Sequence, residues 1–262
     1  MSLLRYVVSR ALNAFDLTIS RKSRIDSLLP DFNQRFEGED ALNFAEARSM
    51  QNRESLYNLW LAGSYCAANH LEGAFVECGV WRGASMQLLA HNLIQNNDLH
   101  RELYLFDTYQ GMTPPSDADV RIKDSRPAAE LGWQIEKWEK EIGFLSGVPA
   151  FATLEDVKGG FENIDISSKR LHFVVGDVLA TIPKHAPEKI CILRIDTDWY
   201  ESTKHILEHC YPRLTTGGVL ILDDYDYWGG AKQAIDEYFE SIETKPFLFH
   251  QGGGGRIYLK QH

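Results

Sequence analysis

The chain has 262 residues, of which 44% are hydrophobic and 24% charged, and its formal net charge is −10. This length suffices for one substantial α/β domain with an elaborated cap. The acidic balance argues against a nucleic-acid partner, because a phosphate-binding surface needs clustered Lys and Arg, and the body of the chain has no such cluster. No run of about 18 apolar residues and no signal-peptide core occur, so we expect a cytoplasmic protein without a membrane span.

The N-terminus carries a helical pattern with basic residues. Apolar residues recur at helical spacing over residues 4–15, and further Arg and Lys follow at 21–24. Such a helix could lie on an anionic membrane surface, but packing on the domain or on a second subunit is the favoured interpretation. We therefore predict an N-terminal helical extension over residues 1–48, with membrane contact through residues 1–24 as the weaker alternative, and one α/β domain over residues 49–262.

Short apolar runs then alternate with helical patterns along the chain. In chain order the expected strands cover residues 74–80, 102–106, 171–175, 190–195 and 219–222, with helices over 84–95, 200–214 and 231–242 and two strand-like pieces at 246–249 and 256–259. Apolar strands separated by helices predict a doubly wound, mostly parallel, Rossmann-like sheet covered on both faces. Right-handed crossovers place the carboxyl ends of its parallel strands at one edge, where such sheets bind ligands.

The connection between the second and third strands is too long for a plain crossover. It covers about residues 110–168 and includes a helical pattern around 128–142. Long excursions at the ligand-binding edge typically form lids or caps over a substrate. We therefore predict a lid insertion in this part of the domain.

The first strand-to-helix turn contains Glu77, Gly79, Gly83 and Ser85. Gly79 lets the backbone approach a ligand closely, and Gly83 lets the helix begin tight against the strand. Glu77 occupies a glycine position of the dinucleotide-binding G-x-G-x-x-G pattern, and its carboxylate would repel a pyrophosphate at the helix N-terminus. A ligand with an ammonium group, such as S-adenosylmethionine (SAM), suits this turn better.

Acidic residues also follow the next two strands. Asp107, with Thr108 beside it, ends the second strand, where an acidic residue typically accepts hydrogen bonds from ribose hydroxyls. Asp177 follows the third strand and is placed to meet an adenine edge. Each could be an ordinary loop carboxylate, but together with Glu77 they lie in register on three successive strands and predict a nucleoside site.

A second acidic group follows the fourth and fifth strands. Asp196 and Asp198 come after the fourth strand, and Asp223 and Asp224 after the fifth. Neighbouring strands lie about 5 Å apart, so these carboxylates converge and need raised pKa values or a cation. Hard oxygen ligands suit Mg²⁺, with Mn²⁺ or Ca²⁺ as substitutes. Helix capping explains one of the four aspartates, so we predict a metal site.

These motifs resemble those of the TylF/MycF family of macrocin-type sugar O-methyltransferases. The resemblance covers most of the chain after residue 50, through the blocks Met50-Gln-Asn-Arg53, Phe75-Val-Glu-Cys-Gly-Val-Trp-Arg-Gly83, Leu105-Phe-Asp-Thr-Tyr-Gln-Gly111, Val174-Val-Gly-Asp-Val-Leu-Ala-Thr-Ile-Pro183, Leu193-Arg-Ile-Asp-Thr-Asp-Trp-Tyr-Glu-Ser-Thr203 and Gly217-Gly-Val-Leu-Ile-Leu-Asp-Asp-Tyr225. It implies a class I methyltransferase domain with a seven-stranded sheet, usually oligomeric, that uses SAM and Mg²⁺. The acceptor is then a small molecule or glycan whose sugar has vicinal hydroxyls.

The resemblance also assigns roles to the second acidic group. It implies that Asp196, Asp223 and Asp224 hold the metal and that Asp198 is a candidate general base. Thr197 stands where the family commonly has Gly, and Trp199 stands where it often has Met. We therefore expect the acceptor pocket to differ from that of the antibiotic-tailoring members.

Three other functions remain as alternatives at this point. A metal-dependent glycosyltransferase also has a strand that ends in D-x-D, as at Asp196 and Asp198, but Glu77 and the second pair at Asp223 argue against it. A dehydrogenase would need the missing G-x-G. A scaffold without activity would keep four convergent carboxylates at a cost in repulsion.

Overall fold

The computed structural model describes residues 38–131 and 150–261. Most of the predicted N-terminal extension, including the amphipathic segment, and the later part of the predicted lid helix lie outside these residues. The described part of the extension forms α4 (Glu39–Glu46), which packs against α5 (Arg53–Ala68) and α6 (Ala84–Gln95). The domain boundary at residue 48 and the lid stay predictions.

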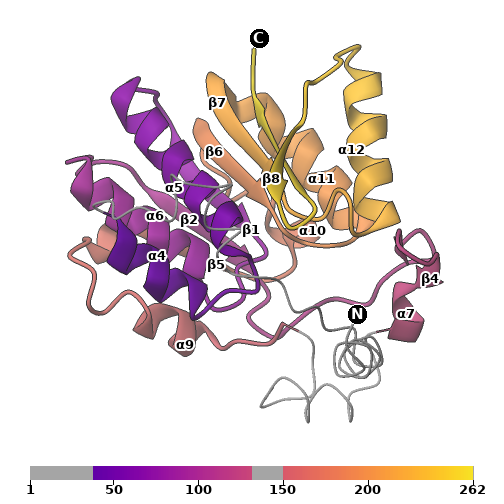
Figure 1. Ribbon diagram of the computed structural model, residues 1–262, viewed down its shortest axis with the longest axis horizontal. Coiled ribbons are helices and arrows are strands. Elements are labelled where there is room, and N and C mark those ends of the chain that lie inside the picture. The colour runs from indigo at the N-terminus through magenta and orange to yellow at the C-terminus, as the bar shows by residue number, and fades with distance from the viewer. Residues whose placement is uncertain (1–37, 132–149, 262) are drawn as a thin grey trace, which may run out of the picture. The chain divides into compact units, whose positions relative to one another are not determined.

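A seven-stranded sheet forms the centre of the described chain (Figure 1). Its strands are β1 (Ala74–Cys78), β2 (Leu103–Asp107), β5 (Leu171–Val175), β6 (Ile190–Ile195), β7 (Leu214–Leu222), β8 (Phe249–Gly252) and β9 (Gly255–Leu259). The order is β5-β2-β1-β6-β7-β9-β8, in which the first five strands are parallel, β9 is antiparallel to β7, and β8 is antiparallel to β9. This confirms the predicted doubly wound, mostly parallel, seven-stranded sheet.

Helices cover both faces of the sheet. One face packs against α5 and α6, and the other against α10 (Val178–Thr181), α11 (Tyr200–Cys210) and α12 (Gly229–Ser241). Phe75 and Val76 point to opposite faces of β1, and they are 0% and 1% exposed. Because both faces are buried, the strand is apolar throughout apart from Glu77, and burying its large side chains contributes about 1.5–3 kcal/mol each.

The glycine pair before the fifth parallel strand acts differently from the prediction. The sequence predicts a helix to residue 214 and a strand at 219–222, whereas α11 ends at Cys210 and β7 begins at Leu214, after the short 3₁₀ helix η2 (Tyr211–Arg213). Gly217 has a φ of +80°, and a Cβ on Gly218 would lie 2.7 Å from the backbone oxygen of Thr215. The two glycines therefore bend a strand, and they do not end a helix.

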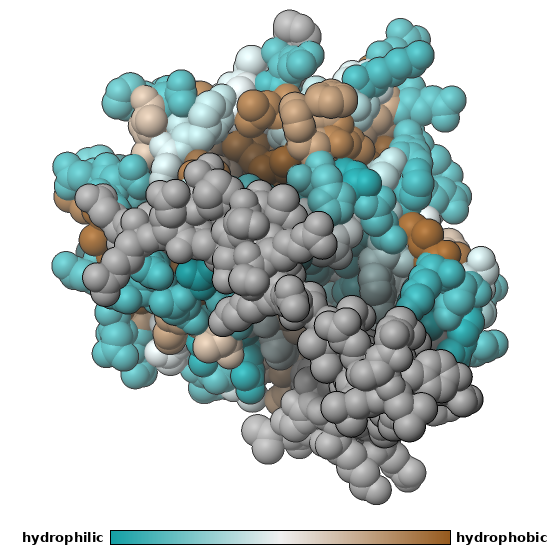
Figure 2. Space-filling model, in the orientation of Figure 1, coloured by the Kyte–Doolittle hydropathy of each residue, from teal (hydrophilic) through white to brown (hydrophobic). Residues whose placement is uncertain are grey.

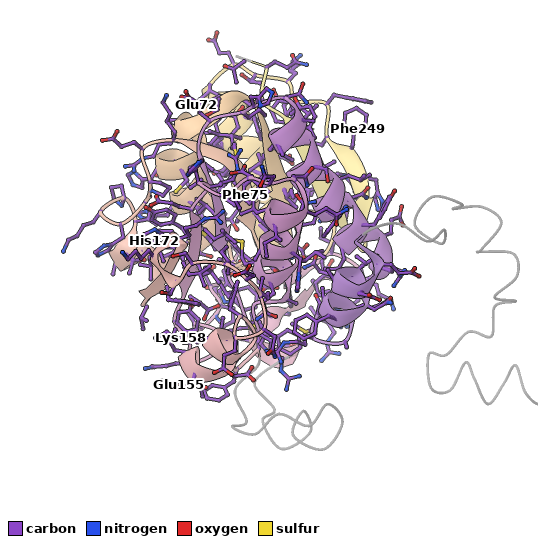
Figure 3. The ribbon with its side chains drawn as sticks, turned by 90° about the vertical axis from the view of Figure 1, so that its left-hand side faces the viewer. Glu72, Phe75, Glu155, Lys158, His172 and Phe249 are labelled. Atoms are coloured by element: carbon purple, nitrogen blue, oxygen red, sulfur yellow. The ribbon has the colours of Figure 1, made fainter. Side chains whose placement is uncertain are left out.

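The carboxyl ends of the parallel strands meet at one edge of the sheet. In Figure 3, Glu72, which precedes β1, lies at the opposite edge from Glu155 of α9 (Leu154–Gly159), with Phe75 between them. His172 of β5 and Phe249 of β8 mark the two outer strands. A ligand site is expected at the α9 edge, since parallel α/β sheets bind ligands beyond their carboxyl ends.

The described part of the long insertion forms a small hairpin, one helical turn and, after the residues that are not described, α9. The hairpin consists of β3 (Val120–Arg121) and β4 (Arg126–Pro127), the helical turn is α7 (Ala128–Leu131), and the 3₁₀ helix η1 (Ser168–Arg170) follows before β5. The Ile122 N–H donates to the carbonyl of Tyr227 (3.0 Å), and Arg121 forms a β-bridge with Trp228. The insertion is thus anchored beside the start of α12.

The surface near β7 and β8 is partly apolar. Figure 2 shows brown, apolar residues in the upper part of the view, where Figure 1 places β7 and β8. Phe247, Phe249 and Leu259 are exposed, and the two phenylalanine rings are 4.5 Å apart. Exposed apolar patches are typical of protein contacts, and the predicted oligomer stays a prediction. Among the described helices, none is long and apolar enough to span a membrane.

Gly79 allows the ends of β1 and β6 to approach each other, and its replacement tests the fold at the site edge. A Cβ on Gly79 would lie 1.8 Å from the backbone oxygen of Asp196, and Gly79 has a φ of +83°. We expect Gly79→Ala to destabilise the protein by about 3 kcal/mol or more and to weaken ligand binding at this edge. Urea unfolding measures the loss.

Gly159→Ala is the matched control, since a Cβ there meets no atom within 4 Å. We expect it to leave the unfolding free energy unchanged or to raise it by up to about 1 kcal/mol, as Ala favours helix. Equal stability of the two variants would contradict the role given to Gly79.

Candidate active site

A cleft of about 680 Å³, part of it open to solvent, lies at the carboxyl ends of β1, β2, β5 and β6. The cleft is lined by residues 79–81, 106–108, 176–178 and 196–199, among others. The structure therefore brings together Gly79, Asp107, Thr108 and Asp177 with Asp196 and Asp198 in one cavity.

Asp107 is held rigidly at the end of β2. Its carboxylate accepts hydrogen bonds from the backbone N–H groups of Val80 (2.6 Å), Trp81 (3.2 Å) and Tyr109 (2.7 Å). Burial raises the pKa of Asp107, and the Val80 hydrogen bond opposes that shift. An oriented carboxylate of this kind can accept further hydrogen bonds from two vicinal ribose hydroxyls.

Asp177 and Thr108 combine a local structural contact with a place in the cleft. The Asp177 carboxylate accepts from the Leu179 N–H (2.9 Å) and caps α10. The Thr108 hydroxyl donates to the Gly111 carbonyl (2.6 Å) and ties down the start of the insertion. Both residues line the cleft and remain candidates for nucleoside contacts.

Three of the predicted cofactor residues lie behind the cleft wall. Glu77 is buried in β1, and Ser85 is buried in α6 with its Oγ accepting from Gln51 Nε2 (2.8 Å). Gly83 precedes α6 with a φ of +77°, and a Cβ there would lie 2.9 Å from Val157 Cγ1. These residues shape the turn below the cleft and are not among the side chains that line it.

Arg194 in β6 connects the two halves of the site. It is 2% exposed, and its Nη1 contacts Glu77 Oε1 (2.6 Å) and Asp196 Oδ2 (2.7 Å), while Nη2 contacts Asp223 Oδ1 (2.9 Å). The sequence analysis gave Arg194 no role. The signal for one was an arginine inside an otherwise apolar strand, opposite Glu77 on the neighbouring strand, because a buried charge needs partners.

Three carboxylates gather beyond Arg194. Oxygen atoms of Asp196, Asp198 and Asp224 lie within 4.8 Å of one another. The Asp198 N–H donates to Asp224 Oδ2 (3.0 Å), and Asp198 has a φ of +61°, which bends the chain into the cluster. Asp223 faces Arg194, and its Oδ1 also accepts from Gln251 Nε2 (3.2 Å). The structure thus gathers two of the three predicted metal ligands with Asp198 and holds Asp223 beside them.

Two tryptophans form the wall next to Asp198. Trp228 Nε1 donates to Asp198 Oδ1 (2.6 Å), and Trp199 Nε1 donates to the Thr113 carbonyl (2.8 Å). Their ring centroids are 5.1 Å apart in an edge-to-face arrangement. The sequence analysis missed Trp228, because nothing in the pattern shows that an aromatic residue 30 positions away reaches the D-x-D segment.

Burial raises the pKa of four carboxyl groups at the centre of the site, those of Glu77, Asp196, Asp198 and Asp224. The pKa of Glu77 rises to about 7 and that of Asp198 to about 6. Burial also places the pKa values of Asp196 and Asp224 well above their ordinary range, with further repulsion between the neighbouring carboxylates. A site of this kind holds protons when it holds no cation, since like charges in a buried cluster cannot all ionise unpaired.

Comparison with known proteins agrees with this geometry. The sequence model of the macrocin O-methyltransferase (TylF) family matches residues 8–248. The chain belongs to this family. Its members are O-methyltransferases, and the strand order is that of class I SAM methyltransferases, so the assignment decides against the D-x-D glycosyltransferase.

Individual relatives give the same result. The chain is 30% identical over 209 residues to the 8-demethyl-8-(2,3-dimethoxy-alpha-L-rhamnosyl)-tetracenomycin-C 4'-O-methyltransferase of Streptomyces olivaceus, covering 80% of this chain and 73% of the relative. It is 26% identical over 211 residues to the mycinamicin III 3''-O-methyltransferase of Micromonospora griseorubida, covering 78% and 74%. Among solved structures, the O-methyltransferase NovP aligns with a TM-score of 0.66 and 25% identity, covering 82% and 83%.

The raised pKa values predict that the protein loses stability as the pH rises. The pKa of Glu77 is 4.5 in an ordinary setting and about 7 in the folded protein, so its contribution is full below pH 4.5 and is lost through pH 7. The loss from Glu77 alone is on the order of 3 kcal/mol, and Asp196, Asp198 and Asp224 act in the same direction. His91, whose pKa burial lowers, acts in the opposite direction.

Melting temperatures between pH 5 and pH 8, in EDTA and with added Mg²⁺, measure this effect. In EDTA we expect a fall of roughly 5–10 °C across the range, and a smaller fall in Glu77→Gln. Added Mg²⁺ should restore most of the loss at pH 8 and little at pH 5, where protons compete for the carboxylates. A melting temperature in EDTA that rises towards pH 8 would contradict the account.

Proposed function

We propose that this protein transfers a methyl group from SAM to a hydroxyl of a sugar on a glycosylated metabolite or glycan, and that it uses a divalent metal ion. The observation that carries the proposal is one cleft that holds both Asp107, placed for a ribose, and the carboxylates of Asp196 and Asp198. The relatives named above act on sugars of glycosylated natural products by their names, which supports a sugar acceptor here.

On the donor side of the cleft, the residues of this chain bind and orient SAM. Asp107 would accept hydrogen bonds from the ribose hydroxyls, and Asp177 lies on the third strand end, where the adenine edge is expected. Gly79 leaves the end of β1 without a side chain. Glu77 lies behind the wall of the cleft, where Arg194 forms an ion pair with one of its carboxylate oxygens and stabilises the buried charge. The proposal includes an electrostatic attraction between the Glu77 carboxylate and the ammonium group of SAM.

The acidic cluster fits a divalent cation of the Mg²⁺ class. The oxygens of Asp196, Asp198 and Asp224 lie within 4.8 Å of one another, so one small cation could reach more than one of these carboxylates. All donors are carboxylate oxygens, which suit Mg²⁺ or Mn²⁺. The carboxylates also carry more negative charge than Arg194 neutralises. We assign Asp196, Asp223 and Asp224 as ligands, and when bound the ion lowers the pKa of an acceptor hydroxyl.

Asp198 is the candidate general base. Burial raises its pKa to about 6, so it is mostly ionised at neutral pH and can still accept a proton. Trp228 holds its Oδ1 at 2.6 Å, which leaves Oδ2 for the acceptor. As the acceptor oxygen bonds to the methyl carbon, the carbon–sulfur bond breaks and the hydroxyl proton passes to Asp198. Trp199 forms the adjacent wall, where the two tryptophans help to exclude water.

Two experiments test the proposal. The first is calorimetric titration of SAM into the protein, with Mg²⁺ and then with EDTA. The second measures methyl transfer from deuterated SAM to rhamnosylated and related glycosides. We expect micromolar SAM binding under both conditions and product formation only with metal. Asp196→Asn and Asp224→Asn should lower turnover by about 100-fold or more, because the metal supplies several kcal/mol, and leave SAM affinity within about threefold.

Asp165→Asn is the control, since Asp165 is exposed and lies away from the cleft. It should keep full activity. Absence of SAM binding under both conditions would overturn the methyl-donor assignment. Full activity in EDTA, or in Asp196→Asn, would overturn the metal role and leave a metal-independent O-methyltransferase.

A further inference from the structure

The glycine run at residues 252–255 lies beside the acidic cluster, although no role for it follows from the methyltransferase mechanism. In the β7–β9 register Leu222 pairs with Arg256, so the turn between β8 and β9 stands directly beyond the carboxyl end of β7, where Asp223 begins. The Asp226 N–H donates to the Gly254 carbonyl (3.0 Å) and ties this turn to the segment that follows β7.

The side chain of Gln251, which belongs to β8 next to this turn, extends into the site. It lies where the β8–β9 register shifts, between His250 and Gly252, and irregularities of this kind re-aim a side chain next to active sites. Gln251 is 1% exposed, and its Nε2 donates to Asp223 Oδ1 (3.2 Å). A buried amide that donates to a carboxylate of a catalytic cluster restricts the orientation of that carboxylate.

The backbone around Gln251 is fixed from the other side. Its carbonyl accepts a hydrogen bond from Asn58 Nδ2 (2.9 Å) and a longer one from Ser55 Oγ (3.5 Å), both on α5. A Cβ on Gly252 would lie 3.0 Å from Asn52 Oδ1 at the start of the same helix. The amide therefore extends from a β-turn that is clamped against α5.

Gly255 provides the space that the amide occupies. A Cβ on Gly255 would lie 2.1 Å from Gln251 Nε2 and 2.8 Å from its Cδ. Gly255 does not have a positive φ, so its backbone accommodates Ala, and the obstacle is the Gln251 side chain alone. The glycine at this position is thus explained by the contact between Gln251 and Asp223.

Arg194 and Gln251 act on the same oxygen of Asp223. Arg194 Nη2 contacts Oδ1 at 2.9 Å, and Gln251 donates to that atom as well. Among the described residues, none donates a hydrogen bond to Oδ2. An ion-pair contact and a hydrogen bond on one oxygen leave the other free to bind a cation, whereas a carboxylate with a single partner can rotate between its two oxygens.

We propose that Gln251 is a positioning residue of the acidic cluster: with Arg194 it holds Asp223 by Oδ1 and presents Oδ2 to the divalent cation. The inference rests on the metal role proposed above. It explains how Asp223, which lies beside the group formed by Asp196 and Asp224, completes the ligand set when the cation binds.

Titration of Mn²⁺ into the full-length protein, followed by the electron paramagnetic resonance signal of free Mn²⁺, tests this role. Gln251→Met keeps the approximate volume of the side chain and removes the donor, and Gly255→Ala displaces the amide without changing a charge. We expect both variants to bind Mn²⁺ about 10-fold more weakly, as outer partners of metal ligands typically contribute 10- to 100-fold. Their SAM affinity should stay within twofold, which also shows that they fold.

Kinetics and a double variant separate positioning from a merely structural effect. The Mn²⁺ concentration for half-maximal activity should rise about 10-fold in Gln251→Met, with kcat restored at saturating Mn²⁺. In the Gln251→Ala background Gly255→Ala should add no further loss, because the obstructing amide is gone. Gln233→Met, a substitution of an exposed glutamine on α12, should match the wild type.

Unchanged Mn²⁺ affinity in both Gln251→Met and Gly255→Ala, with normal binding by the wild type, would overturn the role of Gln251 alone. No Mn²⁺ binding by the wild type would overturn both this role and the metal function. A kcat that stays low in Gln251→Met at saturating Mn²⁺ would also contradict positioning of the cation.

Discussion

A buried guanidinium among carboxylates is the constraint on which the site depends. Arg194 lies in the centre of the sheet and contacts Glu77, Asp196 and Asp223 at 2.6–2.9 Å. Burying one unpaired charge is prohibitive, and removing one partner of a buried ion pair typically costs about 3–5 kcal/mol. The acidic residues of three adjacent strands must therefore stay near Arg194 for the protein to fold. This requirement places the ends of β1, β6 and β7 in the arrangement that a SAM-dependent methyl transfer needs.

The network also separates the two tasks of the cleft. On one side Asp107 is fixed by three backbone N–H groups, and none of the ion pairs of Arg194 involves it, so the proposed contacts of Asp107 with the nucleoside do not depend on the charge balance at the proposed metal site. On the other side Asp196 and Asp223 share Arg194, and both respond to whatever cation the cluster holds. Folding stability and the proposed metal binding are therefore linked through the same carboxylates. The two tryptophans extend this second side towards the acceptor.

Much of the fold was predictable because it follows from periodicity. The apolar runs at 171–175 and 190–195 became β5 and β6 with the predicted bounds, since a strand buried on both faces has a plain sequence signature. The acidic residues at strand ends were predictable from topology. The roles of Arg194, Trp228 and Gln251 were not, because each depends on a side-chain contact between segments that are far apart in the sequence, and that of Gln251 also depends on the register of antiparallel strands. The prediction that the glycines at 217–218 end a helix was wrong for a different reason, because Gly occurs at a bend in a strand as well as at the end of a helix.

The central claim is that Asp196, Asp223 and Asp224 hold a divalent cation beside the nucleoside site. Anomalous diffraction from crystals grown with Mn²⁺ and S-adenosylhomocysteine, the product that SAM leaves after methyl transfer, tests it most directly. The account predicts one peak at the carboxyl edge of the sheet, within about 2.5 Å of oxygens of Asp196, Asp223 and Asp224, with Arg194 still bound to Glu77. A well-ordered site that contains the nucleoside but no peak, or a peak bound by Asp198 without Asp223, would contradict it.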